Sequence, residues 1–239
     1  MIYSTFKKSY AIAQLDLRKE KNKYNWILNL FLYFASVFAI NKGIEFYTKQ
    51  SVSINIYYGV VYYFIFSSGL IFGSELIQDW RNTIKILLSA PVKPIEILFG
   101  KTIFILRAAL KFHYLLLLLI LIVFNKINFM IIIKTFFIVL YYALTGVGIG
   151  LFLSTIAETE TSKKIISFFN FFIMIFGGFF IKINIDNLYF KYITLLFPII
   201  HVNNLFIYNE INLINVFMVI LWFILAIIGA YQFNKNARK

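Results

Sequence analysis

The sequence predicts an all-α protein that crosses a membrane several times. Of its 239 residues, 61% are hydrophobic and only 14% are charged, whereas soluble domains carry about 25% charged residues. Long stretches without Asp, Glu, Lys or Arg recur along the chain, and a membrane-spanning helix needs about 20 mainly apolar residues. Five such stretches are Tyr24–Asn41, Gln50–Ser74, Thr135–Ala157, Ile165–Ile181 and Ile211–Asn234.

A sixth span is predicted around Phe112–Asn125. This uncharged stretch is short, but apolar residues continue on its N-terminal side, interrupted by Arg107 and Lys111. Pro94 suits the first position of a helix, and Glu96 in the first turn favours the positive end of the helix dipole. At 1.5 Å per residue, a helix from Pro94 to the end of the stretch is about 46 Å long, which covers the bilayer core and both interfaces.

The basic residues orient these six spans. Lys and Arg are retained on the cytoplasmic side, and placing the N-terminus inside leaves most of the 23 Lys and Arg residues there. Both termini are then cytoplasmic. The abundant Ile, Phe, Asn, Lys and Tyr use AT-rich codons and indicate a bacterial genome, hence the bacterial plasma membrane. The basic residues outside are Lys42, Lys49, Lys126, Lys134, Lys182 and Lys191.

Two further segments of this single membrane domain (residues 1–239) are predicted to lie at the membrane surfaces. Residues 1–23 are predicted to form an amphipathic helix at the membrane surface, because apolar side chains recur every three or four residues opposite basic ones. Tyr192–Asn209 is uncharged, but Pro198 interrupts it and a seventh span would move the C-terminal basic residues outside. We therefore expect a re-entrant or interfacial hairpin over residues 184–210 on the outer side, packed against the bundle.

The longest cytoplasmic connection contains a connecting segment, residues 78–93, with helical periodicity. Apolar residues at i, i+4, i+7 and i+8 alternate with polar ones, which predicts a short amphipathic helix that Pro91 ends. The residues of this pattern are Trp80, Arg81, Ile84, Lys85, Leu87 and Leu88.

Glycine pairs indicate close helix packing. Gly69 and Gly73 form a G-x-x-x-G pair in the second span, and Gly146 and Gly150 form another in the fourth. Such pairs let helix backbones approach closely in lipid. Whether they join helices of one subunit or of two stays open.

Charged residues near the inner ends of spans two and three are candidates for a functional role. Arg107 and Lys111 form an i, i+4 pair of like charges, which a helix avoids unless something screens it. We expect them to face a water-accessible inner cavity or to pair with Glu75. Unchanged insertion, assembly and transport after charge reversal at Arg107 would exclude both explanations.

No catalytic or metal site is predicted. Phe99–Thr102 matches the end of a phosphate-binding loop, but Ile95 occupies the position of its first glycine and no strand precedes it. His113 and His201 lie in separate elements without neighbouring ligands, and the chain has no Cys, so a metal site is not expected. The basic residues lie at the ends of spans rather than on one face, which disfavours nucleic acid as a partner.

The order of these features resembles the permease subunit of a type-2 ABC transporter along essentially the whole chain. The surface helix, six spans, helical connecting segment and outer hairpin follow in the same order as in that family. The segment Leu87–Val92, followed by Glu96–Leu98 and Gly100-Lys101, is similar to its loop signature. The segment Gly177–Phe180, followed by Leu196–Pro198, is similar to the stretch after its fifth span.

The resemblance implies the membrane half of an exporter. This chain would bind no cofactor, whereas ATP and Mg²⁺ would bind two cytoplasmic ABC ATPase subunits. A second permease chain, identical or related, would complete a homodimer or heterodimer in the lipid bilayer. The residues of the connecting segment would dock on the ATPase and transmit its closure to the spans. The cargo is expected to be an amphipathic or hydrophobic peptide, toxin or antimicrobial.

Two other classes of function stay open. A secondary transporter would show internal repeats and ionisable residues at the membrane midplane. A non-transporting scaffold or immunity protein would bind a partner without moving cargo. Dependence on a separate ATPase distinguishes the exporter from both.

Overall fold

The computed structural model describes residues 8–10, 25–48, 54–87, 93–156, 159–176, 192, 195–206 and 211–236. Regular structure is helical throughout these residues, with no strand among them, so the predicted all-α class is confirmed. The elements are α2 (Asn25–Thr48), α3 (Ile54–Leu87), α4 (Pro94–Ala108), the π-helical segment η1 (Ala109–Tyr114), α5 (Leu115–Val123), α6 (Phe129–Ile156), α7 (Thr159–Phe176), α9 (Pro198–Phe206) and α10 (Leu213–Asn236).

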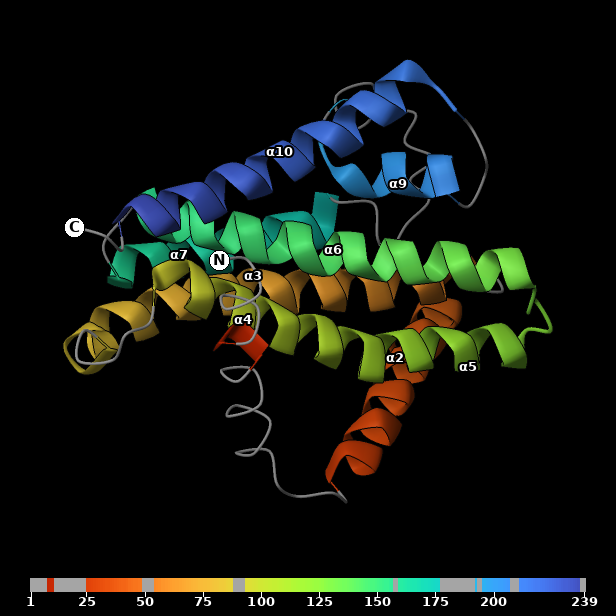
Figure 1. Ribbon diagram of the computed structural model, residues 1–239. Helices are drawn as coiled ribbons and strands as arrows, with labels where there is room; N and C mark the ends of the chain where they lie inside the picture. The colour runs from red at the N-terminus through yellow and green to blue at the C-terminus, as the bar shows by residue number, and fades with distance from the viewer. Residues whose placement is uncertain are drawn as a thin grey trace.

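Helix α6 occupies the centre of the bundle (Figure 1). It packs most extensively against α3 on one side and α10 on the other, and most of its buried residues are small or apolar. The third span runs beside α3 and α6, and α9 lies against α10. Helix α2 contacts α3 at one of its ends and leaves the bundle at a steep angle (Figure 1).

The third span is one continuous run of helix from α4 through η1 to α5. It begins as predicted, with Pro94 in the first turn. The backbone N–H of Lys93 donates to Glu96 Oε2 at 2.9 Å, which satisfies one of the amide groups that a helix start leaves without a partner. The sequence therefore specifies where this span begins.

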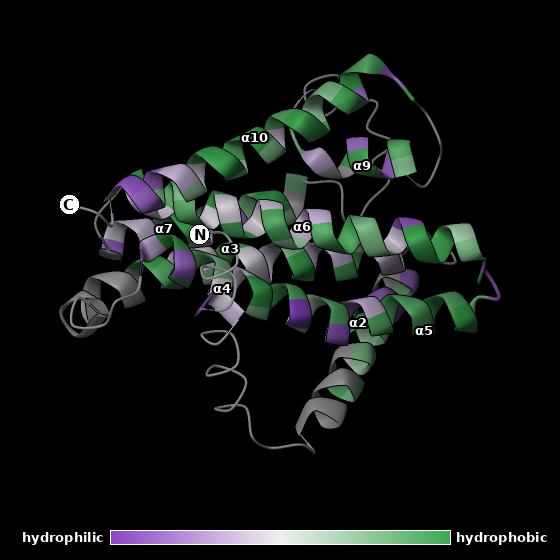
Figure 2. Ribbon diagram, viewed as in Figure 1, coloured by the Kyte–Doolittle hydropathy of each residue, from purple (hydrophilic) through white to green (hydrophobic). Residues whose placement is uncertain are grey.

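Four helices of the described residues are long and apolar enough to cross a membrane. They are Tyr57–Ile77, Pro94–Val123, Phe129–Ile156 and Leu213–Lys235. Figure 2 shows the apolar residues along α5, α6 and α10, and hydrophilic bands on the third span. Helices α2 and α7 fall on the other two predicted spans, and the count of six stays a prediction.

The predicted connecting helix is not separate from the second span. Residues 78–87 continue α3 without a break, and no Pro or Gly interrupts the helix between Glu75 and Leu87. At 1.5 Å per residue α3 is about 51 Å long, more than the roughly 30 Å hydrocarbon core, so it extends beyond the membrane. Leu88 lies outside the described residues, as do residues 89–92.

The two predicted surface segments are described only in part. Of residues 1–23, only 8–10 are described, and these form a helical turn. Within the predicted hairpin 184–210, the described parts are residue 192 and residues 195–206. Residues 195–197 form a turn and α9 begins at Pro198, so Tyr192–Asn209 is not one continuous helix. The re-entrant character of the hairpin stays a prediction.

Candidate functional site

The two predicted glycine pairs face each other across α3 and α6. A Cβ atom added to Gly69 would lie 2.9 Å from the carbonyl oxygen of Ala143, and one added to Gly146 would lie 2.5 Å from that of Phe66. At Gly73 and Gly150 the added atom would overlap the backbone of the other helix. The four glycines therefore form one seam within a single chain, where only hydrogen fits between the two backbones.

A second seam of small residues joins α6 to α10. The Cα atoms of Gly148 and Ala226 lie so close that a Cβ on the glycine would overlap the alanine. Gly229 packs in the same way against the backbone of α6 at Gly148 and Phe152. Sequence reasoning did not identify this seam, because its residues are not arranged as a single G-x-x-x-G pair.

The candidate charged residues of the third span lie beside its π-helical segment. Arg107 is exposed near the end of α4, whereas Lys111 lies half-buried within η1. The Lys111 ammonium group stands 5.3 Å from the ring centre of Phe112, within the range of a cation–π contact. π-Helical turns are rare and occur frequently at functional sites, and no sequence signal predicted this one.

Glu75 is exposed near the C-terminal end of the candidate span Tyr57–Ile77. The ion pairs between described side chains are Lys8–Glu96 and Lys42–Glu45, and neither includes Glu75 or Arg107. An inner cavity around Arg107 and Lys111 stays a prediction.

An ionic contact links the N-terminal segment to the start of the third span. Lys8 Nζ lies 3.9 Å from Glu96 Oε2, and the Glu96 side chain is only 4% exposed. The same carboxylate oxygen accepts the N–H of Lys93. Because Lys93 ends the connecting segment 78–93, Glu96 contacts the N-terminal segment, the connecting segment and α4 at one point.

The predicted ATPase-coupling residues occupy the C-terminal turns of α3. Trp80, Arg81, Ile84, Lys85 and Leu87 lie within this helix, and their side chains fall outside the described part of the structure. Their spacing along a continuous helix keeps the apolar positions on one face.

The opposite end of the bundle is held by hydrogen bonds that link α9, the turn before it and α10. His201 is fully buried, with Nδ1 at 2.7 Å from Asn215 Oδ1 and Nε2 at 2.8 Å from the carbonyl oxygen of Leu195. The Trp222 indole N–H donates to the carbonyl oxygen of Leu196 at 2.9 Å. His201 therefore pairs with neighbouring protein groups, and among the described residues no three His, Asp or Glu side chains gather as metal ligands do.

The arrangement contains packing seams, a second span that continues as one long helix, and apolar spans. The family model of ABC-2 family transporter proteins matches residues 6–231, nearly the full length. No curated protein matches the chain. The match covers both seams, the connecting segment, three of the four candidate spans in full and most of the fourth. The chain therefore belongs to the ABC-2 family of ABC transporter proteins, as a multi-pass membrane permease subunit.

Proposed function

We propose that this permease works in an ATP-driven exporter that moves an amphipathic or hydrophobic cargo, such as a peptide, toxin or antimicrobial, out of a bacterial cell. The family match over residues 6–231 carries the proposal. ABC-2 permeases work with ABC ATPases, which supply the ATP hydrolysis. In the proposed complex two ATPase subunits bind a pair of permease chains on the cytoplasmic side.

The continuity of α3 supports a mechanical role for the connecting segment. A helix that crosses the membrane and continues into the cytoplasm transmits a push at its end directly to the span. The chain returns at Lys93 and meets the carboxylate of Glu96 at the start of the next span. Movement of the connecting segment would therefore act on spans two and three together.

Purification in a mild detergent, followed by an ATPase assay, tests the proposal. We expect the tagged chain to copurify with a soluble ATPase whose turnover is sensitive to vanadate. In proteoliposomes whose ATPase subunits face the external medium, an amphipathic peptide should then move from that medium into the lumen only when ATP is present. Recovery of the chain alone, under conditions that preserve a known complex of this family, would favour a secondary transporter or a scaffold.

A further inference from the structure

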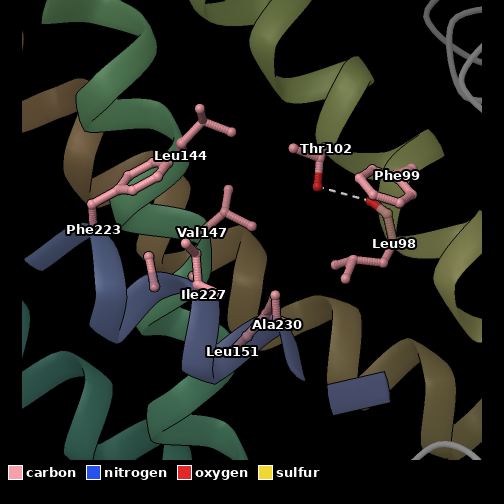
Figure 3. A pocket seen from close by; sticks show the side chains of 11 residues that line it. Leu98, Phe99, Thr102, Leu144, Val147, Leu151, Phe223, Ile227 and Ala230 are labelled. Atoms are coloured by element: carbon pink, nitrogen blue, oxygen red, sulfur yellow. Dashed lines mark hydrogen bonds between the residues drawn. The ribbon is translucent and has the colours of Figure 1, made fainter. Parts of the chain in front are cut away.

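An apolar groove lies between α4, α6 and α10. Figure 3 shows it bordered by Thr102, Phe99 and Leu98 on one side and by Val147 and Ile227 on the other. Its volume is about 220 Å³. The three lining helices belong to three of the four candidate membrane spans, so the groove lies within the membrane part of the protein.

The lining of the groove offers almost no polar group to a ligand. Thr102 is its one residue with a polar side chain, and its hydroxyl donates to the carbonyl oxygen of Leu98 at 2.8 Å. Phe99 and Ile227 at the rim are 52% and 54% exposed. A groove of this kind suits a hydrocarbon chain, since an apolar cavity of about 150 Å³ already binds benzene.

Two basic residues lie close in sequence to residues that line the groove. The start of α4, the end of α6 and the end of α10 lie together at one end of the bundle (Figure 1). Lys101 is the neighbour of Thr102, and Lys235 follows Ala230, a lining residue, by little more than one helical turn. Each Lys near a membrane surface attracts anionic lipid headgroups.

We propose that the groove is a binding site for one anionic phospholipid, with an acyl chain along α4, α6 and α10 and the phosphate near Lys101 and Lys235. By the distribution of basic residues this is the cytoplasmic leaflet. The site would bind the lipid whatever the cargo and the direction of transport. The lipid would fill the space that the α6–α10 seam leaves beside α4.

Native mass spectrometry of the delipidated complex tests the site. The probes are dioleoylphosphatidylglycerol and zwitterionic dioleoylphosphatidylcholine. We expect the first bound phosphatidylglycerol at a several-fold lower concentration than phosphatidylcholine. Lys235→Gln should weaken phosphatidylglycerol binding about fivefold, the factor expected for one surface charge, whereas Lys126→Gln at the opposite end of the third span should not change it.

Filling the groove provides the second arm. Ala230→Phe places a ring in the groove and should remove the tight phosphatidylglycerol site, whereas Ile224→Phe on an exposed face of α10 should leave it intact. Equal lipid binding by both variants would overturn the proposal. A loss of dimers in Ala230→Phe with unchanged lipid binding would also overturn it, because the groove would then hold a second copy of the chain.

A measurement without bulky substitutions covers the case in which Ala230→Phe does not fold. The chain has no Cys, so a fluorophore can be attached at one introduced cysteine. Phe99→Cys lies at the groove rim, and Ile122→Cys is equally exposed at the far end of the same span. Brominated phosphatidylglycerol should quench the label at 99 at least threefold better than brominated phosphatidylcholine, with no difference at 122. Equal quenching at 99 would refute the site.

Discussion

The third and fourth spans are neighbours in sequence but are built in different ways. In the most apolar stretch of α6, 61% of the residues are buried within the protein, against 33% in the third span. Helix α6 contacts its neighbours through glycine and alanine, backbone against backbone. The third span carries Arg107, Lys111 and a π-helical segment instead.

This difference separates a rigid part of the permease from a part suited to rearrangement. Packed interfaces change between discrete arrangements rather than deforming gradually. The glycine seams fix α3, α6 and α10 to one another at short range, so we expect these helices to move as a unit. The third span contacts that unit over a smaller share of its surface and begins at the polar contact around Glu96.

The largest expected effect comes from breaking the α3–α6 seam. Gly150→Ala places a methyl group against the backbone of Leu70, and we expect it to cost about 3 kcal/mol of stability. Gly43→Ala in α2 is the matched control, because nothing lies within 4 Å of the added atom, and helix propensity favours Ala by up to about 1 kcal/mol. Thermal unfolding of the purified chains measures both. Similar melting temperatures would show that the seam is not tight.

The second prediction concerns the end of α3 rather than its seam. Trp80→Ala, or Leu87→Ala, should reduce ATP-dependent transport by at least about tenfold, equivalent to roughly 1.4 kcal/mol of lost coupling, while the amount of protein in the membrane stays unchanged. Ile71→Ala, at an exposed position within the span, is the control. Normal transport by both connecting-segment variants would remove this segment from the coupling mechanism.

A smaller effect is expected at the polar contact that begins the third span. Glu96→Gln removes the charge facing Lys8 but keeps an oxygen for the Lys93 N–H, and it should cost about 1 kcal/mol or less. Glu96→Ala loses both contacts and should cost more. A double-mutant cycle with Lys8→Gln measures the ionic part. A coupling energy of zero would mean that the ion pair contributes nothing to stability.

The smallest expected effect concerns a polar contact between α6 and α10. Thr155 donates to Gln232 Oε1 at 2.8 Å, and Thr155→Val should cost about 0.6 kcal/mol, the average for interhelical hydrogen bonds in membranes. Thr102→Val is the control, because the hydrogen bond that it removes lies within α4 and no contact between helices is lost. Equal effects on melting temperature would indicate that the α6–α10 interface depends on its glycines alone.

Local features of the fold could be predicted from sequence. Long uncharged stretches gave the all-α class, and Pro94 with Glu96 gave the start of the third span. The continuity of α3 does not follow from the sequence, because the charged, amphipathic pattern after Glu75 predicts a separate helix. An amphipathic pattern shows which face of a helix is apolar. It does not show whether that helix is separate from the one before it.

Contacts between distant residues could not be predicted in the same way. The spacing of Gly69, Gly73, Gly146 and Gly150 indicated close packing but did not name the partner helix. Lys8 and Glu96 are far apart in sequence, and no sequence pattern around either residue predicts that the two side chains come into contact. Residues 109–114 carry no sequence pattern that predicts their π-helical conformation.

The position of the glycine seam along α3 determines how far the rigid unit extends from it. Gly69 and Gly73 lie close to the middle of Ile54–Leu87, which leaves about 25 Å of helix on each side. Because the seam fixes α3 to α6, a displacement at the C-terminal end of α3 would move α6 and α10 with it instead of bending or tilting α3 alone. A push on the connecting segment would then shift three spans by similar distances.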